Sequence, residues 1–167
     1  MGPSIAPDVL PNVLAPNLRV VFCGSAASRA SAVVGAYYAG PGNRFWPTLR
    51  EIGLTDRELA PQEFHVVLDY GIGLTDLAKH ASGADHELPE AADDVAGLMA
   101  RIERHRPRFL AFNGKRAARA VMSRAVDYGP QSWTIGDARV VVLPSTSGAA
   151  RRYWKIAPWH ALAAAAR

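Results

Sequence analysis

Small polar residues follow three apolar stretches of this chain. The run LRVVFC leads into the turn 24–28, RFLAF into 113–115, and RVVVL into 144–148. Asp76 ends a glycine-interrupted segment, YGIGLTD, and adds an ionisable carboxylate. A turn of small residues lets a ligand approach backbone amides closely, and a carboxylate can act as a general base toward water. With Tyr38 beside the first turn, these residues are suited to holding a flat polar ring.

The order of apolar and amphipathic segments predicts an α/β fold. Strands are predicted at 18–23, 108–112 and 139–143, and helices at 43–53, 89–105, 115–126 and 151–166, with Pro158 interrupting the last helix. Residues 64–68 are either a strand or a buried connector, and 69–76 are predicted as a loop. Alternating strands and helices favour three layers, α/β/α, around a mainly parallel sheet. Such folds bind ligands outside the carboxyl ends of their strands, so we expect the polar turns to form one site.

Composition narrows the class of protein. The 167 residues suggest one domain, 17–167, preceded by an extended lead-in over 1–16 that holds four of the 12 prolines. No apolar run approaches the roughly 20 residues that span a bilayer, and the N-terminus lacks the layout of a signal peptide. We therefore expect a cytoplasmic monomer without membrane contacts, associated with the nucleoid if the source is bacterial.

Charge and ligand-forming residues point to a partner and exclude some cofactors. The formal net charge of +4 favours a polyanionic partner. A single cysteine, Cys23, excludes an intramolecular disulfide and a four-cysteine iron–sulfur cluster. The five histidines show no close ligand spacing. We expect neither a metal nor another cofactor.

Five segments resemble the uracil-DNA glycosylase superfamily, in particular its mismatch-specific uracil and thymine-DNA glycosylase branch. They are VVFCG with its five-residue turn, GPGNRFW, YGIGLTDL, RPRFLAFNGKRA and LPSTSGAAR, and they follow the family's order between Leu18 and Trp154. The blocks YYAGPGNRFW and LPSTS also resemble hypoxanthine-DNA glycosylases. The resemblance implies a four-stranded parallel sheet between helices. It also implies a monofunctional glycosylase of base excision repair, which flips a deaminated base, most simply uracil, out of DNA and hydrolyses its N-glycosidic bond.

The catalytic position departs from the branch that the chain resembles. There the first turn reads Gly-Ile-Asn-Pro-Gly, and its Asn positions the attacking water. Here Ala26 stands at the position of that Asn, and a methyl group cannot orient water. Asp76 is the leading replacement, with Asn113 and Ser25 as further candidates. Two structural alternatives stay open, because Asp76 and Asn113 could each merely cap the segment that follows.

The resemblance also assigns residues that contact the base. Tyr38 matches the aromatic residue that stacks on the flipped base, and Ser31 matches a serine that contacts uracil. Ala26 and Asn43 are expected to line the same pocket. The alternative for Tyr38 is a core tyrosine whose hydroxyl has found a partner.

The loop after the third predicted strand matches the family's intercalation loop. Residues expected to contact DNA are Ser145, Ser147, Gly148, Ala149, Arg151, Arg152 and, from the second turn, Lys115. Gly148 and Ala149 stand where a leucine wedge is often found. A small wedge should read the opposing base weakly, so activity on single strands is expected, where flipping costs little. The basic residues could instead be an ordinary solvated helix face.

Two other functions fit the same residues. One is a hypoxanthine-DNA glycosylase, which would need a pocket for a purine. The other is a protein that binds damaged bases and lost catalysis together with the family's Asn. A polar oxygen directed at the sugar C1′ would favour an enzyme over a binding protein.

Overall fold

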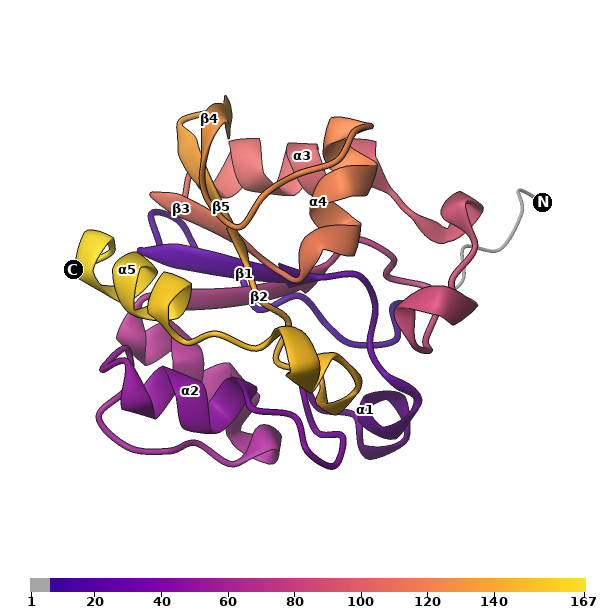
Figure 1. Ribbon diagram of the computed structural model, residues 1–167, viewed down its shortest axis with the longest axis horizontal. Helices are drawn as coiled ribbons and strands as arrows, with labels where there is room; N and C mark the ends of the chain where they lie inside the picture. Colours follow the sequence, from indigo (N-terminus) through magenta and orange to yellow (C-terminus); the bar gives the residue numbers. More distant parts are fainter. Residues whose placement is uncertain (1–6) are drawn as a thin grey trace.

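The computed structural model describes residues 7–167 and contains a five-stranded sheet in the order β2-β1-β3-β5-β4 (Figure 1). The strands are β1 (Val20–Gly24), β2 (Ile72–Asp76), β3 (Phe109–Asn113), β4 (Gly129–Ile135) and β5 (Ala138–Leu143). β2, β1, β3 and β5 run parallel, and β4 pairs with β5 antiparallel. The prediction of a mainly parallel α/β sheet is confirmed. The resemblance implied four strands, and the sheet has five.

β4 is one of the two strands that the sequence analysis did not predict as strands. Its sequence GPQSWTI begins with glycine and proline, and its residues alternate between half-buried and exposed up to the buried Ile135. Proline cannot donate to a strand ladder and is therefore confined to edges. β4 lies at the edge of the sheet and carries a register irregularity between Pro130 and Thr134. Its local signal resembles that of a loop, and only pairing with β5 makes it a strand.

β2 corrects the prediction of a loop over 69–76. All five of its residues are buried. A Cβ on Gly73 would stand 2.7 Å from the carbonyl oxygen of Val13 and 2.8 Å from Leu18, because the segment before β1 crosses β2 and Val13 pairs with Leu74. The glycines that suggested a loop instead allow this close backbone approach. Asp76 thus ends a strand, as the other candidate residues do.

Helices cover both faces of the sheet. They are α1 (Arg29–Val34), α2 (Phe45–Glu51), α3 (Val95–His105), α4 (Lys115–Met122) and α5 (Ala157–Ala165), with shorter 3-10 turns η1 (Pro61–Tyr70), η2 (Asp85–Glu87), η3 (Glu90–Ala92) and η4 (Gly148–Tyr153). Figure 1 shows α3 and α4 on one face and α2 and α5 on the other. The predicted three-layer arrangement is therefore present.

Helix bounds differ from the sequence predictions where a cap intervenes. α3 begins only at Val95, because the Asp94 carboxylate accepts a hydrogen bond from the Gly97 amide and caps the helix. α4 ends at Met122, since Ser123 adopts a left-handed conformation, φ 56°. Residues 64–68 belong to η1 and form no strand. The predicted helix 151–166 is divided into η4 and α5, and Pro158 lies in the first turn of α5.

Two apolar cores lie on the two faces of the sheet. In β1, Val20 and Phe22 face one core, and Val21 and Cys23 face the other, as the two-residue period of a strand requires. The first core joins α2, η1 and α5 around the buried Trp159, and the second joins α3 and α4. From residue 7 onward the predicted lead-in packs against this body, with Leu10 and Val13 buried. Residues 1–6 of that lead-in lie outside the described residues.

Candidate active site

A cavity of about 770 Å³ opens at the carboxyl ends of β1, β2, β3 and β5. Most of the candidate residues line it, although they come from distant parts of the chain: Ser25, Ala26, Ser31, Tyr38, Asn43, Asp76, Asn113, Lys115, Ser145, Ser147 and Ala149. The strand register explains why these residues lie together. Gly24 pairs with Asp76, and Asn113 pairs with Leu143, immediately before the last loop. Parallel strands end at the same edge of a sheet, which places their following residues together.

Asp76 is a carboxylate buried beside this cavity. Its side chain is 4% exposed, and among residues 7–167 it accepts no hydrogen bond. The amides that follow it are bonded to β1 and its turn, Leu77 to Gly24 and Ala78 to Ser25, so Asp76 is not a helix or turn cap. Burial raises the pKa of Asp76 from its ordinary 3.8 to about 6, and the positive charges of Lys79 and Arg101 oppose this rise. A carboxylate with such a pKa is ionised at neutral pH and can accept a proton from water.

Lys79 and Arg101 approach Asp76 from two different elements. Lys79 follows β2, is 4% exposed, and donates from Nζ to the Tyr37 hydroxyl at 3.2 Å. Arg101, on α3, donates from Nη2 to the backbone oxygen of Asp76 at 3.0 Å. Burial lowers the pKa of Lys79, while the nearby Asp76 raises it. Both cations favour the ionised form of Asp76, although neither forms an ion pair with the carboxylate among the described residues.

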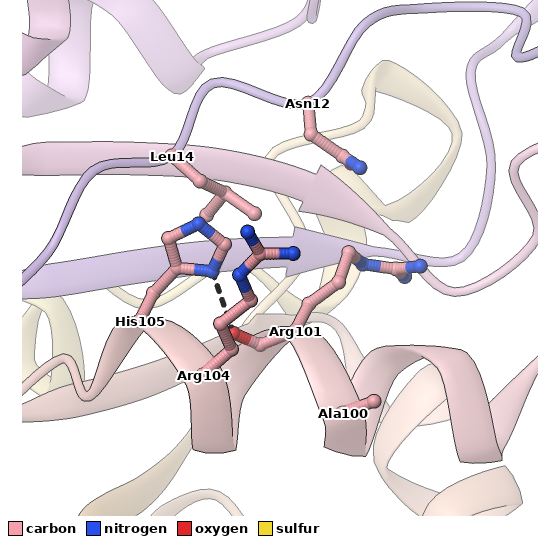
Figure 2. Close-up of a pocket in the computed structure, with 6 residues that line it drawn as sticks. All are labelled: Asn12, Leu14, Ala100, Arg101, Arg104 and His105. Carbon is pink, nitrogen blue, oxygen red and sulfur yellow. Dashed lines mark hydrogen bonds between the residues drawn. The ribbon is translucent and has the colours of Figure 1, made fainter.

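Arg101 also lines a second hollow, of about 430 Å³, on the other side of the strand that carries Asp76. Its walls are Asn12, Leu14, Ala100, Arg101, Arg104 and His105, as Figure 2 shows. His105 Nδ1 donates to the Arg101 carbonyl at 2.8 Å. Arg104 and His105 belong to the last turn of α3, where cations face the negative end of the helix dipole, and Arg101 is bonded to the backbone of Asp76. The position of these residues on α3 accounts for the basic character of the hollow, so no ligand is needed to explain it.

Asn113 is fixed by the loop after β5. Its Nδ2 donates to Thr146 Oγ1 at 2.9 Å, and its Oδ1 accepts from the Thr146 amide at 3.0 Å. Thr146 itself is 1% exposed. The Asn113 side chain does not cap α4, because its two polar atoms join the ends of β3 and β5. One wall of the cavity is thereby held rigid.

The match to known proteins covers this whole arrangement. The family described as the Uracil DNA glycosylase superfamily matches residues 11–166. This chain belongs to that superfamily. Its members are DNA glycosylases, hydrolases that act on N-glycosyl bonds, and this chain is a DNA glycosylase.

A solved structure supports the same assignment for this glycosylase. The chain is similar to a protein from Methanosarcina acetivorans, assigned as a uracil DNA glycosylase and solved by solution NMR. The TM-score is 0.63 at 27% sequence identity, and the similarity covers 94% of this chain and 96% of the other. The match extends over both layers of helices and the sheet between them.

Ser31 and Tyr38 form the wall of the glycosylase cavity that follows β1. Ser28 caps α1 by accepting a hydrogen bond from the Ser31 amide, and Ser31 Oγ accepts from the Ala39 amide at 3.0 Å. Tyr38 lies at φ 53°, and its ring packs on Phe45 with the centroids 4.0 Å apart. Asn43 accepts a hydrogen bond from the Phe45 amide, so it orders the start of α2 as well as lining the cavity.

The rim of the glycosylase cavity is basic, but its cations are not equivalent. Arg116 forms a largely buried ion pair with Asp93 at 3.0 Å. We therefore assign Arg116 a structural role, not a phosphate contact. Lys115 lies over the ring of Tyr128 at 4.4 Å and lines the cavity. Arg151 and Arg152 are exposed on η4 and lie outside the cavity lining.

The small residues at the tip of the last loop lie against the GPGN loop. A Cβ on Gly148 would stand 3.4 Å from the carbonyl oxygen of Pro41 and 3.5 Å from that of Gly42. Gly148 itself is not part of the cavity lining, whereas its exposed neighbour Ala149 is. The two loops therefore form one edge of the cavity mouth.

Three residues of the site were not among the candidates. Thr146 lay within the loop LPSTSG, so a search for partners of Asn113 could have found it. Lys79 follows Asp76 by three residues, but nothing local distinguishes it from a surface lysine. Arg101 had no sequence signal, because only the packing of α3 against β2 brings it to Asp76.

Residues 7–167 contain neither a cluster of metal ligands nor a helix suited to spanning a membrane. No group of three or more histidine, cysteine, aspartate or glutamate side chains could hold a metal ion in this part of the chain. Of the helices within the same residues, none is both long and apolar enough to cross a membrane.

Proposed function

We propose that this glycosylase excises uracil from DNA and that Asp76 is its general base. The observation that carries the proposal is the Asp76 carboxylate, which is desolvated, has a pKa of about 6, and stands at the cavity that Ala26 also lines. Ala26 leaves the position of the family's Asn without a polar group. Asp76 is the ionisable carboxylate buried at that cavity and can take over the activation of water.

The reaction that we propose breaks the bond between C1′ of the deoxyribose and N1 of uracil. The electron pair of this bond leaves with the base, and positive charge develops on the sugar. A water molecule forms the new bond to C1′ and gives its proton to Asp76. The uracil anion later takes a proton from solvent, and no strand cleavage is expected because no lysine is assigned as a Schiff-base nucleophile.

The same proposal gives the other cavity residues their roles. The flipped uracil stacks on Tyr38, which lines the cavity, and stacking on an aromatic ring contributes about 1–3 kcal/mol per base. Ser31 lies beside the base, and Asn113 holds the opposite wall through Thr146. A cavity of about 770 Å³ can receive a nucleobase with part of its sugar.

We further propose that the enzyme reads the opposing base weakly and accepts single strands. Gly148 and Ala149 at the cavity mouth offer little apolar surface to fill the gap that a flipped nucleotide leaves. In a duplex, the flipped nucleotide should therefore return readily to its place in the base stack. A single strand has no pairing to lose, so flipping costs less.

An oligonucleotide with one uracil tests the proposal, single-stranded and paired with G or with A. The strand is incubated with protein, treated with alkali and separated on a denaturing gel. We expect cleavage by the native protein and a loss of about 100-fold or more in Asp76→Ala, in the range of general-base contributions. Asp69→Ala is the matched control, since Asp69 is an exposed aspartate on η1.

Other outcomes of this experiment would contradict the proposal. Full activity of Asp76→Ala would remove Asp76 from the reaction. Release of hypoxanthine without release of uracil would replace the substrate. Tight binding of uracil-containing DNA with no base release from any substrate would indicate a protein that only binds lesions.

A further inference from the structure

The hydroxyl of Tyr38 is a buried polar group that has no hydrogen-bond partner among residues 7–167. Buried polar groups are normally paired, because an unmade hydrogen bond is unfavourable in a low-dielectric interior. Stacking on a base requires only the ring of Tyr38. The position of its hydroxyl therefore calls for another explanation.

The backbone and its neighbours fix Tyr38 in this orientation. Its φ of 53° is uncommon for a residue with a Cβ, and such conformations persist where the surroundings impose them. On one side, Trp46 Nε1 donates to the carbonyl of Tyr37 at 2.9 Å. On the other side, Ser31 accepts from the amide of Ala39. These bonds hold the backbone on both sides of Tyr38, and the ring cannot turn away without losing its packing on Phe45.

The Tyr38 hydroxyl and the carboxylate of Asp76 both lie close to Gly24. A Cβ on Gly24 would stand 3.3 Å from the Tyr38 hydroxyl and 3.0 Å from Asp76 Oδ1. Both oxygens thus lie against the same side of one glycine, and each lacks a hydrogen-bond partner among the described residues. A donor without a partner and a carboxylate oxygen therefore lie beside the same position, where the chain carries no side chain.

We infer that Tyr38 is a positioning residue, whose hydroxyl donates a hydrogen bond to the Asp76 carboxylate and holds it toward the sugar when the substrate closes the site. The inference rests on the proposed function for its catalytic consequence, but we expect the hydrogen bond to form in solution in the free protein as well. Hydrogen bonds of catalytic groups are often long in the free enzyme and shorten in the complex. Burial and the charge of Asp76 raise the pKa of Tyr38 well above its ordinary value, against the opposing effect of the nearby Asn113 side chain, so the hydroxyl keeps the proton that it donates.

Most of the other polar groups around Asp76 already form hydrogen bonds elsewhere. Lys79 donates to Tyr37, whose own hydroxyl donates to the carbonyl of Pro11. Arg101 donates to the backbone of Asp76, and Asn113 is joined to Thr146. The Cys23 thiol donates to the carbonyl of Gly24. Arg101 Nε is also buried without a partner among residues 7–167. Of these two unpaired donors, the Tyr38 hydroxyl is the one that lies against Gly24 together with Asp76 Oδ1.

The direct test measures the pKa of Asp76 from its carboxyl ¹³C chemical shift in the native protein and in Tyr38→Phe. A hydrogen bond to the ionised form lowers a carboxyl pKa. We therefore expect the pKa of Asp76 to rise in Tyr38→Phe. Tyr70→Phe is the matched control. The Tyr70 hydroxyl donates to Asp56 on the surface, so this substitution removes the same kind of hydroxyl far from the site.

Single-turnover excision of uracil gives the second measurement. Tyr38→Phe keeps the ring, so we expect unchanged affinity for uracil-containing DNA and a rate about tenfold lower, the size expected for one hydrogen bond to a charged group. The acidic limb of its pH–rate profile should move to higher pH. Gly24→Ala should move the pKa in the same direction, since its methyl group would separate the two oxygens.

The outcomes separate this inference from the proposed function. An unchanged pKa of Asp76 in Tyr38→Phe overturns the inference, whether or not the native protein excises uracil. A loss of affinity at an unchanged pH profile would leave Tyr38 only its stacking role and overturns it too. A native protein that releases no base would contradict the proposed function, while the titration of Asp76 would still decide the contact.

Discussion

The carboxylate of Asp76 has an energetic consequence that follows from its burial. Its pKa of about 6 in the folded protein exceeds the ordinary 3.8, so the folded state binds the proton more tightly than the unfolded state. Ionisation of Asp76 therefore lowers the free energy of unfolding as pH rises from about 4 through 6. Above pH 6 this destabilisation is complete. At about 1.4 kcal/mol per pKa unit, the unfavourable contribution at neutral pH is about 3 kcal/mol.

Asp76→Asn should consequently stabilise the folded protein while lowering its activity. At pH 7.5 we expect its free energy of unfolding to exceed that of the native protein by about 1–3 kcal/mol, because the desolvated charge is gone. At pH 4 the difference should vanish. Urea unfolding at both pH values measures it. A variant that is less stable at pH 7.5 would show that the carboxylate makes a favourable contact in the folded protein.

Lys79 should influence the reaction through Asp76 without contacting the substrate. Its positive charge lowers the pKa of Asp76. In Lys79→Met that charge is removed while the buried stem is kept, so the pKa of Asp76 should rise and the acidic limb of kcat/KM should move to higher pH. Activity well above the limb should change little. A pH–rate profile that coincides with that of the native protein would exclude Lys79 from this role.

At the scale of elements, the loop between β5 and α5 sets how the enzyme reads duplex DNA. Ala149 is exposed at the cavity mouth. In Ala149→Leu a larger apolar side chain would fill the space of a flipped nucleotide and slow its return. We expect excision from duplex to rise about 3- to 10-fold relative to single strands, from the added buried methylenes. Rates on matched single- and double-stranded substrates measure the ratio.

The control for the loop is a leucine placed away from the cavity mouth. Ala157→Leu changes an exposed alanine in the first turn of α5 and should leave the ratio of duplex to single-strand rates as it is. An equal ratio in Ala149→Leu and the native protein would mean that this loop does not occupy the gap in the duplex.

At the scale of the whole molecule, the net charge of +4 should act mainly through the basic residues near the cavity. Arg151 and Arg152 are exposed on η4. Replacing both by alanine should make the plot of log K against log salt less steep by about 1–2, since each phosphate contact contributes about 0.9. Arg106→Ala is the control, because Arg106 lies before β3 at the opposite end of the strands and pairs with Asp137. A slope unchanged by the double substitution would place the phosphates elsewhere.

The predictability of this protein differed between its parts for physical reasons. β1, β3 and β5 are buried strands with continuous apolar runs, and these were predicted from local pattern alone. β2 and β4 were not, because Gly73 is required by a crossing backbone and Pro130 is tolerated by an edge. Both features look like loop signals until the neighbouring segment is known.

The sequence by itself determined the α/β class, the superfamily and most residues of the cavity. It could do so because parallel strands carry the residues after them to one edge, and these residues form short, ordered motifs. The packing of distant segments was needed to show that Asp76 is buried, that Arg101 reaches it from α3, and that the Tyr38 hydroxyl and Asp76 lie against the same glycine, Gly24. Those relations depend on packing between segments far apart in the chain, and a pKa is set by such surroundings rather than by neighbours in sequence.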